Sequence, residues 1–183
     1  TRLSKEDFPV KLYYNQNVYV RNKSLAGRAD ETEQSGIEFI GDGSIDADIE
    51  VISMAYEALK RNNVASFKLE LCHAGFFKSI LNKMDITATQ KADICKLIEG
   101  KNYAALGDML AKFPDSKEAD VIKKLPRLFG DVSVINEAKK LYNDEKSNEA
   151  LDYLRRVYEK LCDMGLGDNI TIDLGLVNRS NYY

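Results

Sequence analysis

The chain has 183 residues, of which 44% are hydrophobic and 30% are charged, and its formal net charge is −3. This length is enough for one sizeable domain or for one domain with an insertion. The slight acidic balance argues against nucleic-acid binding by the chain as a whole, although a local basic patch stays open. The sequence has no run of 18 apolar residues and no basic-then-apolar leader, so we expect neither a membrane span nor a signal peptide.

The three cysteines predict reduced, buried thiols in a cytoplasmic protein. Cys72, Cys95 and Cys162 form no CxxC pair, and each lies within an apolar run. An odd number of such cysteines is typical of a reducing compartment. Cys72 is followed by His73, but adjacent residues on a strand point to opposite faces, so we do not expect a catalytic cysteine–histidine pair.

The first predicted elements are two antiparallel strands. Residues 9–20, PVKLYYNQNVYV, alternate in polarity and are rich in aromatic and β-branched side chains, with Pro9 at the start, where a missing N–H matters least. Residues 21–33 have no period and predict an exposed loop. Residues 34–40, QSGIEFI, predict the second strand.

A helix and a short strand come next in the chain. The segment GDGS at 41–44 has turn chemistry. The apolar stripe that follows, from Ile45 to Leu59, predicts a helix with Ser44 or Asp46 as its N-cap. Residues 66–71, SFKLEL, alternate in polarity and predict the strand.

Helical periods dominate from about residue 74 to residue 162, and they are broken at Gly100, Pro114, Pro126 and Gly130. We expect the core of this block to contain these apolar residues: Leu97, Leu106, Leu110, Val121, Leu125, Leu128, Ile135 and Leu141. A last long helix carries the stripe Leu151, Leu154, Tyr158 and Leu161 and ends near Gly165. ITIDLGLV at 170–177 returns to a strand.

Strands that flank a block of helices predict an α+β fold, with an antiparallel sheet and a helical insertion. A parallel βαβ fold stays open, although a helical stretch of about 90 residues is long for one crossover. In both arrangements, the strands are where we expect a ligand-binding site.

One face of the second predicted strand carries polar groups that could bind a ligand. Alternation places Gln34, Gly36 and Glu38 on this face. Gly36 would let a ligand approach the backbone, Glu38 could accept an N–H, and Gln34 could both donate and accept. A solvated face with a bulge glycine explains the same pattern, so both interpretations stay open.

The sequence alone gives no support for catalysis. Its single histidine, His73, is expected to cap or pack rather than to act as an acid or base. Tyr182 and Tyr183 offer two hydroxyls on an apolar support, for which core or interface packing is the default. The HExxH, GxGxxG, Walker and GxSxG motifs are absent and no metal-ligand cluster stands out, so we expect no metal and no cofactor.

Four segments together resemble a known family. They are KLYYNQNVYV, GRADETEQSGIEFIGDG, FKLELCHAGFF and DLGLVNRSNYY. In this order they are similar to the core motifs of histidyl-tRNA synthetases, and more closely to the synthetase-like regulatory subunits of ATP phosphoribosyltransferase. The similarity covers about residues 9–92 and 151–183, and the helical middle fits the family's variable insertion only loosely.

The resemblance implies a class II synthetase fold, an antiparallel sheet with helices against it. The core would comprise residues 1–83 and 150–183, and residues 84–149 would form the helical insertion. Residues 9–40 resemble motif 2 of the class, and the segment that ends at Tyr183 resembles the histidine-specific motif. We therefore expect the chain to be a fragment that lacks the first and last core motifs.

The sequence departs from the synthetase pattern at positions that catalysis needs. The motif-2 strand of the family usually ends in an arginine that binds the substrate carboxylate and the α-phosphate, and this chain has Val20 at that position. The family has an acidic residue shortly after this arginine, and this chain has Asn22 at that position. In the histidine-specific motif, Asn178 replaces arginine and Asn181 replaces aspartate. Loss of one donor to a developing charge typically costs about 10²–10³ in rate, so the resemblance implies no catalytic residue in this chain.

Arg21 and Arg179 follow the two substituted arginine positions by one residue. A shift of one residue places a strand side chain on the opposite face, so neither is a replacement unless the backbone bulges there. If the backbone bulges there, the alternative that the chain is the catalytic core of a histidyl-tRNA synthetase stays open.

The positions that contact histidine in the family carry matching residues in this chain. By resemblance, Gln34 would contact the amino-acid end of histidine and Glu38 its imidazole, and Tyr182 and Tyr183 would form the aromatic pair beside the ring. Arg28 matches an arginine of the motif-2 loop that faces the nucleotide in the enzymes. A site built for both imidazole nitrogens would reject apolar analogues, because they would leave a carboxylate buried and unpaired.

The resemblance implies a non-catalytic regulatory subunit of ATP phosphoribosyltransferase in histidine biosynthesis. Its partner would be the short-form catalytic subunit, which joins ATP to phosphoribosyl pyrophosphate, and histidine would be the feedback effector. We also expect a cytoplasmic homo-oligomer that does not bind tRNA. A synthetase-like module with an unrelated partner is a third hypothesis, which co-purification with a phosphoribosyltransferase subunit would separate.

Overall fold

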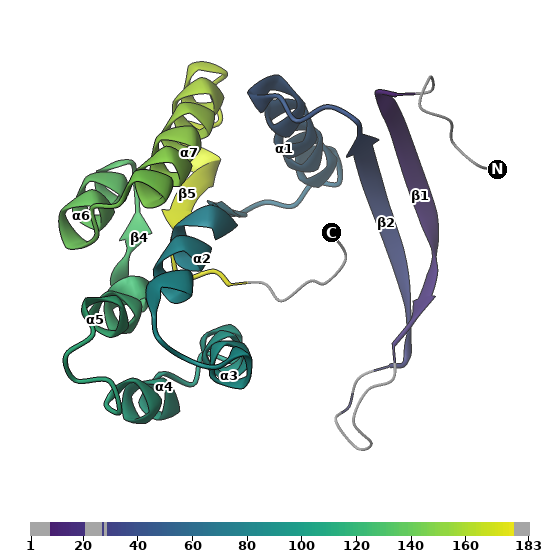
Figure 1. Ribbon diagram of the computed structural model, residues 1–183. Helices are drawn as coiled ribbons and strands as arrows, with labels where there is room; N and C mark the ends of the chain where they lie inside the picture. The colour runs from purple at the N-terminus through teal and green to yellow at the C-terminus, as the bar shows by residue number, and fades with distance from the viewer. Residues whose placement is uncertain (1–7, 21–26, 28, 178–183) are drawn as a thin grey trace. The chain divides into compact units, whose positions relative to one another are not determined.

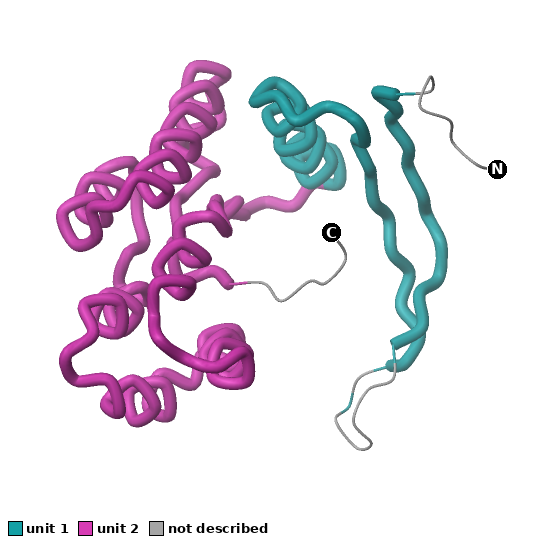
Figure 2. The backbone as a smooth tube through the Cα atoms, in the orientation of Figure 1, with its two compact units in different colours: residues 1–62 teal, residues 63–183 magenta. Residues whose placement is uncertain are grey.

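The structure is a computed structural model that describes residues 8–20, 27 and 29–177 (Figure 1). The chain forms two compact units, residues 1–62 and residues 63–183 (Figure 2). The helices on both sides of the predicted insertion boundaries lie in the second unit together with the helices between them. The division into a core and an insertion at residues 84–149 therefore stays a prediction.

The first unit contains the predicted antiparallel hairpin. Strand β1 (Val10–Tyr19) pairs with β2 (Glu31–Ile40) in a register without interruption. The second strand was predicted to begin at residue 34, because the residues before it are polar, but β2 begins at Glu31. The reason is a set of cross-strand contacts, since Asn17 Nδ2 and Tyr19 Oη donate to Glu31 Oε1 at 2.7 and 2.9 Å.

Helix α1 (Ile45–Arg61) follows the hairpin through a tight turn. Gly41 has a φ of 94°, which favours glycine, and Ser44 is the N-cap, with its Oγ 3.2 Å from the N–H of Ala47. Lys11 of β1 forms an ion pair with Glu50 of α1. This contact ties the helix to the face of the hairpin that carries the odd-numbered residues of β1.

The described part of the second unit, residues 63–177, contains six α-helices and a small sheet. The helices are α2 (Ala74–Lys83), α3 (Ala88–Glu99), α4 (Tyr103–Leu110), α5 (Lys117–Lys124), α6 (Ser133–Leu141) and α7 (Glu145–Asp163). Short 3₁₀ helices span Leu125–Arg127 and Gly167–Asn169. The four predicted breaks of the helical block all fall between α-helices, because glycine and proline act locally on the backbone.

The small sheet has the strand order β3 (Leu69–Leu71), β5 (Ile170–Asp173), β4 (Phe129–Gly130). Strands β4 and β5 are antiparallel, whereas β3 and β5 are parallel. The antiparallel expectation therefore fails for β3 and β5, because a block of several helices can return the chain to the same end of a sheet. Strand β5 also ends earlier than predicted, where Asp173 Oδ1 accepts from the N–H of Gly175 at 2.8 Å.

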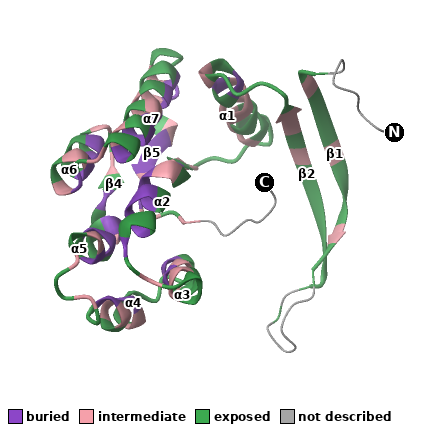
Figure 3. Cartoon of the chain, viewed as in Figure 1, coloured by how far each residue is buried: buried purple, intermediate pink, exposed green. Residues whose placement is uncertain are grey.

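The hydrophobic core lies mainly in the helical unit, whereas the hairpin is largely exposed (Figure 3). Six of the eight predicted core residues of the helical block are buried, and Leu97 and Leu141 are half-buried. In α7 the stripe contains Leu151, Leu154 and Leu161 as predicted. Tyr158 is only half-buried, and Val157 is the buried residue at that turn.

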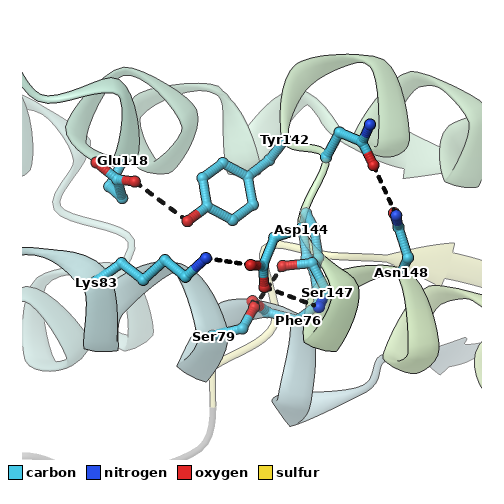
Figure 4. Close-up of polar contacts among 9 residues, drawn as sticks. Phe76, Ser79, Lys83, Glu118, Tyr142, Asp144, Ser147 and Asn148 are labelled. Atoms are coloured by element: carbon cyan, nitrogen blue, oxygen red, sulfur yellow. Dashed lines mark hydrogen bonds and ion pairs between the residues drawn. The ribbon is translucent and has the colours of Figure 1, made fainter.

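Polar contacts fasten α2 to α7 inside this core (Figure 4). Ser79 Oγ donates to the carbonyl of Phe76 at 2.7 Å and lies 2.5 Å from Ser147 Oγ. The single proton of Ser79 is thus used, and Ser147 is the donor between the two hydroxyls. Asp144 caps α7 through the N–H of Ser147, and its hydrogen bond with Lys83 lowers the pKa of this carboxyl.

Candidate functional site

The predicted site residues that the structure describes lie on one face of the β1–β2 hairpin. Residues directly opposite each other in an antiparallel pair share a face. Tyr14 is opposite Gly36, and Leu12 is opposite Glu38. Gln34, Gly36 and Glu38 therefore share a face, as predicted, and Lys11, which contacts α1, points to the other face.

Tyr14 is a residue of this face that sequence reasoning missed. A Cβ built on Gly36 would lie 2.4 Å from both Cζ and Oη of Tyr14, so the ring lies directly over the glycine. Gln34 Nε2 donates to Tyr14 Oη at 2.6 Å. The shared parity of the two positions was visible in the sequence, but the register that sets them opposite each other was not.

Gly36 serves to accommodate a cross-strand tyrosine. The ladder runs without interruption on both sides of it, so the expectation of a bulge at this glycine is wrong. An aromatic side chain that covers a strand glycine is a known way to fix register and shield the backbone. The pairing holds Tyr14 and Gln34 in one polar cluster.

Glu38 lies at the other end of the same face and is half-buried. A hollow of about 160 Å³ between the hairpin and α1 is lined mainly by the opposite face of the hairpin, with Lys11, Ile37 and Phe39 beside Met54, so it is not a pocket on the face of Glu38. Pockets for small molecules usually measure about 300–1,000 Å³. The described hairpin residues therefore supply one wall of a site rather than a closed cavity.

Val20 extends the same face beyond the end of β1. Its N–H donates to the carbonyl of Asp30 at 2.8 Å, which continues the β1–β2 register by one pair. Val20 therefore has the parity of Leu12 and Tyr14 and lies on the face of the candidate site. An isopropyl group cannot offset phosphate charge, and no bulge interrupts β1 between Val10 and Val20.

Eight residues that the sequence analysis singled out lie outside the described residues, among them the substituted positions Asn22, Asn178 and Asn181. Arg28, Tyr182 and Tyr183 are the other predicted contacts, and Arg21 and Arg179 are the arginines that follow the substituted positions. Their assignments stay predictions.

His73 caps a helix, as predicted. It is the N-cap of α2, and its Nδ1 accepts from the N–H of Gly75 at 3.0 Å. Its ring packs edge-on against Tyr153, with 5.5 Å between the ring centroids. The imidazole therefore has a structural role at the start of α2.

Cys72, the residue before His73, directs its thiol toward Leu176, and this thiol is a weak nucleophile. Its Sγ donates to the carbonyl of Leu176 at 3.2 Å, and burial raises the pKa of this thiol to about 11. All three cysteines are free, as predicted, but they are half-buried rather than buried.

The described face of the hairpin offers three kinds of polar group. Gln34 offers an amide, Tyr14 a hydroxyl and Glu38 a carboxylate. Within residues 8–20, 27 and 29–177, no group of three or more histidine, cysteine or acidic side chains is placed to hold a metal ion. Across the same described range, no helix is both long and apolar enough to cross a membrane.

Comparison with known proteins adds the family. Residues 1–183 match the family model described as histidyl-tRNA synthetase. The chain belongs to the histidyl-tRNA synthetase family. A curated ATP phosphoribosyltransferase regulatory subunit from Clostridium novyi is 40% identical over 186 residues, which cover 100% of this chain and 44% of that protein. The chain thus spans less than half the length of this relative.

Solved structures support the fold of this family member. A crystal structure of an ATP phosphoribosyltransferase regulatory subunit/histidyl-tRNA synthetase from Bacillus halodurans matches with a TM-score of 0.83 and 30% identity, covering 96% of this chain and 46% of that chain. A chain in an ATP phosphoribosyl transferase complex from Thermotoga maritima matches with a TM-score of 0.65 and 18% identity, covering 92% and 58%. The second likeness shows the fold alone. The predicted class II synthetase-like fold is confirmed.

Proposed function

We propose that this chain belongs to a non-catalytic regulatory subunit of ATP phosphoribosyltransferase, which binds histidine and the catalytic subunit. The observation that carries the proposal is Val20 on the face of Gln34 and Glu38, where the family resemblance expects an arginine. The groups that would recognise an amino acid are present, whereas the cation that would stabilise a phosphoryl transition state is replaced by an apolar side chain. The site is therefore suited to binding rather than to adenylation.

A catalytic-subunit partner follows from the relatives. The Clostridium novyi protein is named as a regulatory subunit of ATP phosphoribosyltransferase. A subunit without its own catalysis acts on the reaction only through contact with the subunit that performs it. The full-length protein would form this contact in the cytoplasm, as a homo-oligomer.

Histidine is the proposed effector. Glu38 would accept an imidazole N–H, and Gln34, oriented by Tyr14, would contact the amino-acid end. Tyr182 and Tyr183 would cover the ring, and Arg28 would face the nucleotide side. Feedback inhibition requires that histidine bind the less active state of the complex more tightly than the active state.

A calorimetric titration of histidine into the full-length protein tests the site. Glu38→Ala should weaken binding by about 10–100-fold, because a hydrogen bond to a charged group contributes about 1.5–3 kcal/mol. The matched control is Glu33→Ala, which removes an exposed carboxylate from the opposite face of the same strand. If Glu38→Ala binds histidine as the wild type does, Glu38 is not the imidazole contact.

A histidyl-tRNA synthetase core is the second candidate. The family model favours it, and so does the Bacillus halodurans protein, which is described both as a regulatory subunit and as a histidyl-tRNA synthetase. Histidine-dependent exchange of pyrophosphate into ATP distinguishes the two candidates. The regulatory subunit should show no exchange above background, and exchange at a rate typical of an enzyme, about 1 s⁻¹ or more, would favour the synthetase.

A further inference from the structure

The hydroxyl of Tyr14 has a proton that no described residue accepts. Tyr14 Oη accepts a hydrogen bond of 2.6 Å from Gln34 Nε2, and within residues 8–20, 27 and 29–177 this hydroxyl donates none. A phenol has one proton to donate and can accept at the same time. Tyr14 is only half-buried, so the unused donor is accessible on the face of the candidate site.

The amide of Gln34 adds an acceptor beside this donor. Gln34 uses Nε2 in the bond to Tyr14, which leaves its carbonyl oxygen Oε1 as an acceptor on an exposed side chain. The bond from Gln34 also polarises the Tyr14 hydroxyl, which makes that hydroxyl a stronger donor. A donor and an acceptor held side by side complement an α-amino acid, because its carboxylate accepts hydrogen bonds and its ammonium group donates them.

The hydroxyl lies between the two ends of the predicted histidine site. A Cβ on Gly36 would lie 2.4 Å from Tyr14 Oη, so the hydroxyl lies over the residue midway between Gln34 and Glu38. Two residues of a strand span about 7 Å. A ligand that donates an imidazole N–H to Glu38 would therefore have its amino-acid end within reach of Tyr14 and Gln34.

The described part of this face carries no cation that could bind a ligand carboxylate. Its residues are Leu12, Tyr14, Gln16, Val18 and Val20 on the first strand, and Thr32, Gln34, Gly36 and Glu38 on the second. Val20 stands where the family resemblance expects the arginine that binds the carboxylate, and Glu38 would repel one. Between Gln34 and Glu38, the Tyr14 hydroxyl is the donor that remains for this group.

We propose that Tyr14 is a further histidine-binding residue, whose hydroxyl donates to the ligand carboxylate while Gln34 Oε1 accepts from the ligand ammonium group. This contact rests on the histidine site proposed above, and it adds the residue that distinguishes an amino acid from an amine. A hydrogen bond from a hydroxyl to a carboxylate is about twice as strong as a bond between neutral groups. The site would thus select ligands that carry an imidazole, an ammonium group and a carboxylate.

Calorimetric titration with two ligands tests the contact in the full-length protein. Histidine and histamine share the imidazole and ammonium groups, but histamine has no carboxylate. The wild type should bind histidine about 10–100-fold more tightly than histamine, because a hydrogen bond to a charged group contributes this much to affinity. Tyr14→Phe keeps the ring over Gly36 and should remove most of this preference. The matched control is Tyr13→Phe, which removes the hydroxyl of a side chain that is 86% exposed on the opposite face of the same strand. The control should keep the preference of the wild type.

The outcomes separate this contact from the proposed function. If Tyr14→Phe weakens the binding of both ligands equally, Tyr14 only orients Gln34, and the contact with the carboxylate is refuted. If Tyr14→Phe binds histidine as tightly as the wild type does, the hydroxyl is not part of the site, although the proposed histidine site stands. A wild type that binds both ligands with equal affinity refutes the contact even where the variant does not fold. If the wild type binds neither ligand, the proposed histidine site fails, and the contact fails with it.

Discussion

Replacement of Gly36 by alanine tests the geometry of the candidate site most specifically. The new Cβ would lie 2.4 Å from Tyr14 Cζ and Oη, whereas non-bonded carbon atoms prefer about 3.5–4.0 Å. The atoms in conflict are at the free end of the Tyr14 side chain, so the ring should move away by about 1 Å or more while the strand stays in place. The hydrogen bond of 2.6 Å from Gln34 to Tyr14 would then be lost.

The expected destabilisation is about 1 kcal/mol. Loss of the Gln34–Tyr14 hydrogen bond costs about 1 kcal/mol net, and loss of the cross-strand ring contact costs about 0.5 kcal/mol. The smaller conformational freedom of alanine in the unfolded chain offsets about 0.5 kcal/mol. Histidine affinity should also fall, because Gln34 loses the hydroxyl group that orients it.

A double-mutant cycle measures this coupling by urea unfolding of the full-length protein. Gly36→Ala and Tyr14→Ala should together cost less than the sum of the single variants, by about 1 kcal/mol. Tyr14→Phe is the control, since it keeps the ring over Gly36 and removes only the hydroxyl. Strict additivity of the two substitutions would refute the contact between the tyrosine ring and the glycine.

Three further predictions concern caps, thiols and the polar core. Ser44→Ala should destabilise the protein by about 1 kcal/mol in thermal unfolding, whereas Ser44→Asp keeps the cap of α1; equal losses would contradict the cap. Because burial raises the Cys72 pKa from 9.0 to about 11, the thiol stays protonated in the folded state, and its contribution to stability should be present below pH 9 and lost as the pH rises through 11. Alkylation of Cys72 should accordingly be slow at pH 8, and labelling as fast as in the unfolded chain would disprove this. Ser79→Ala and Ser147→Ala should each cost about 1–2 kcal/mol in urea unfolding, and the double variant should cost less than their sum; an additive result would contradict the contact between the two hydroxyls.

Local signals in the sequence predicted much of the fold. Alternation placed both strands of the hairpin, and the glycine and proline breaks separated the helices, because these effects depend only on neighbouring residues. Ser44 was one of two N-cap candidates, and the structure selects it. His73 was expected to cap or pack, and it caps α2.

Non-local pairing was the part that the sequence could not provide. The contact of Tyr14 with Gly36 depends on the register, and the parallel pairing of β3 with β5 depends on the path of the helical block between them. The polar start of β2 at Glu31 resembled a loop, because its stabilising partners lie on the other strand. The face shared by Gln34 and Glu38 was predictable, since alternation within one strand determines it.

The rate of the phosphoribosyltransferase reaction tests the central claim most directly. The purified short-form catalytic subunit is assayed with ATP and phosphoribosyl pyrophosphate, with and without the full-length protein that carries this chain, across a series of histidine concentrations. We predict that addition of the protein changes the rate and makes it sensitive to histidine, and that Glu38→Ala abolishes this sensitivity. A catalytic subunit with the same rate and the same response to histidine in the presence and absence of this protein would contradict a regulatory role.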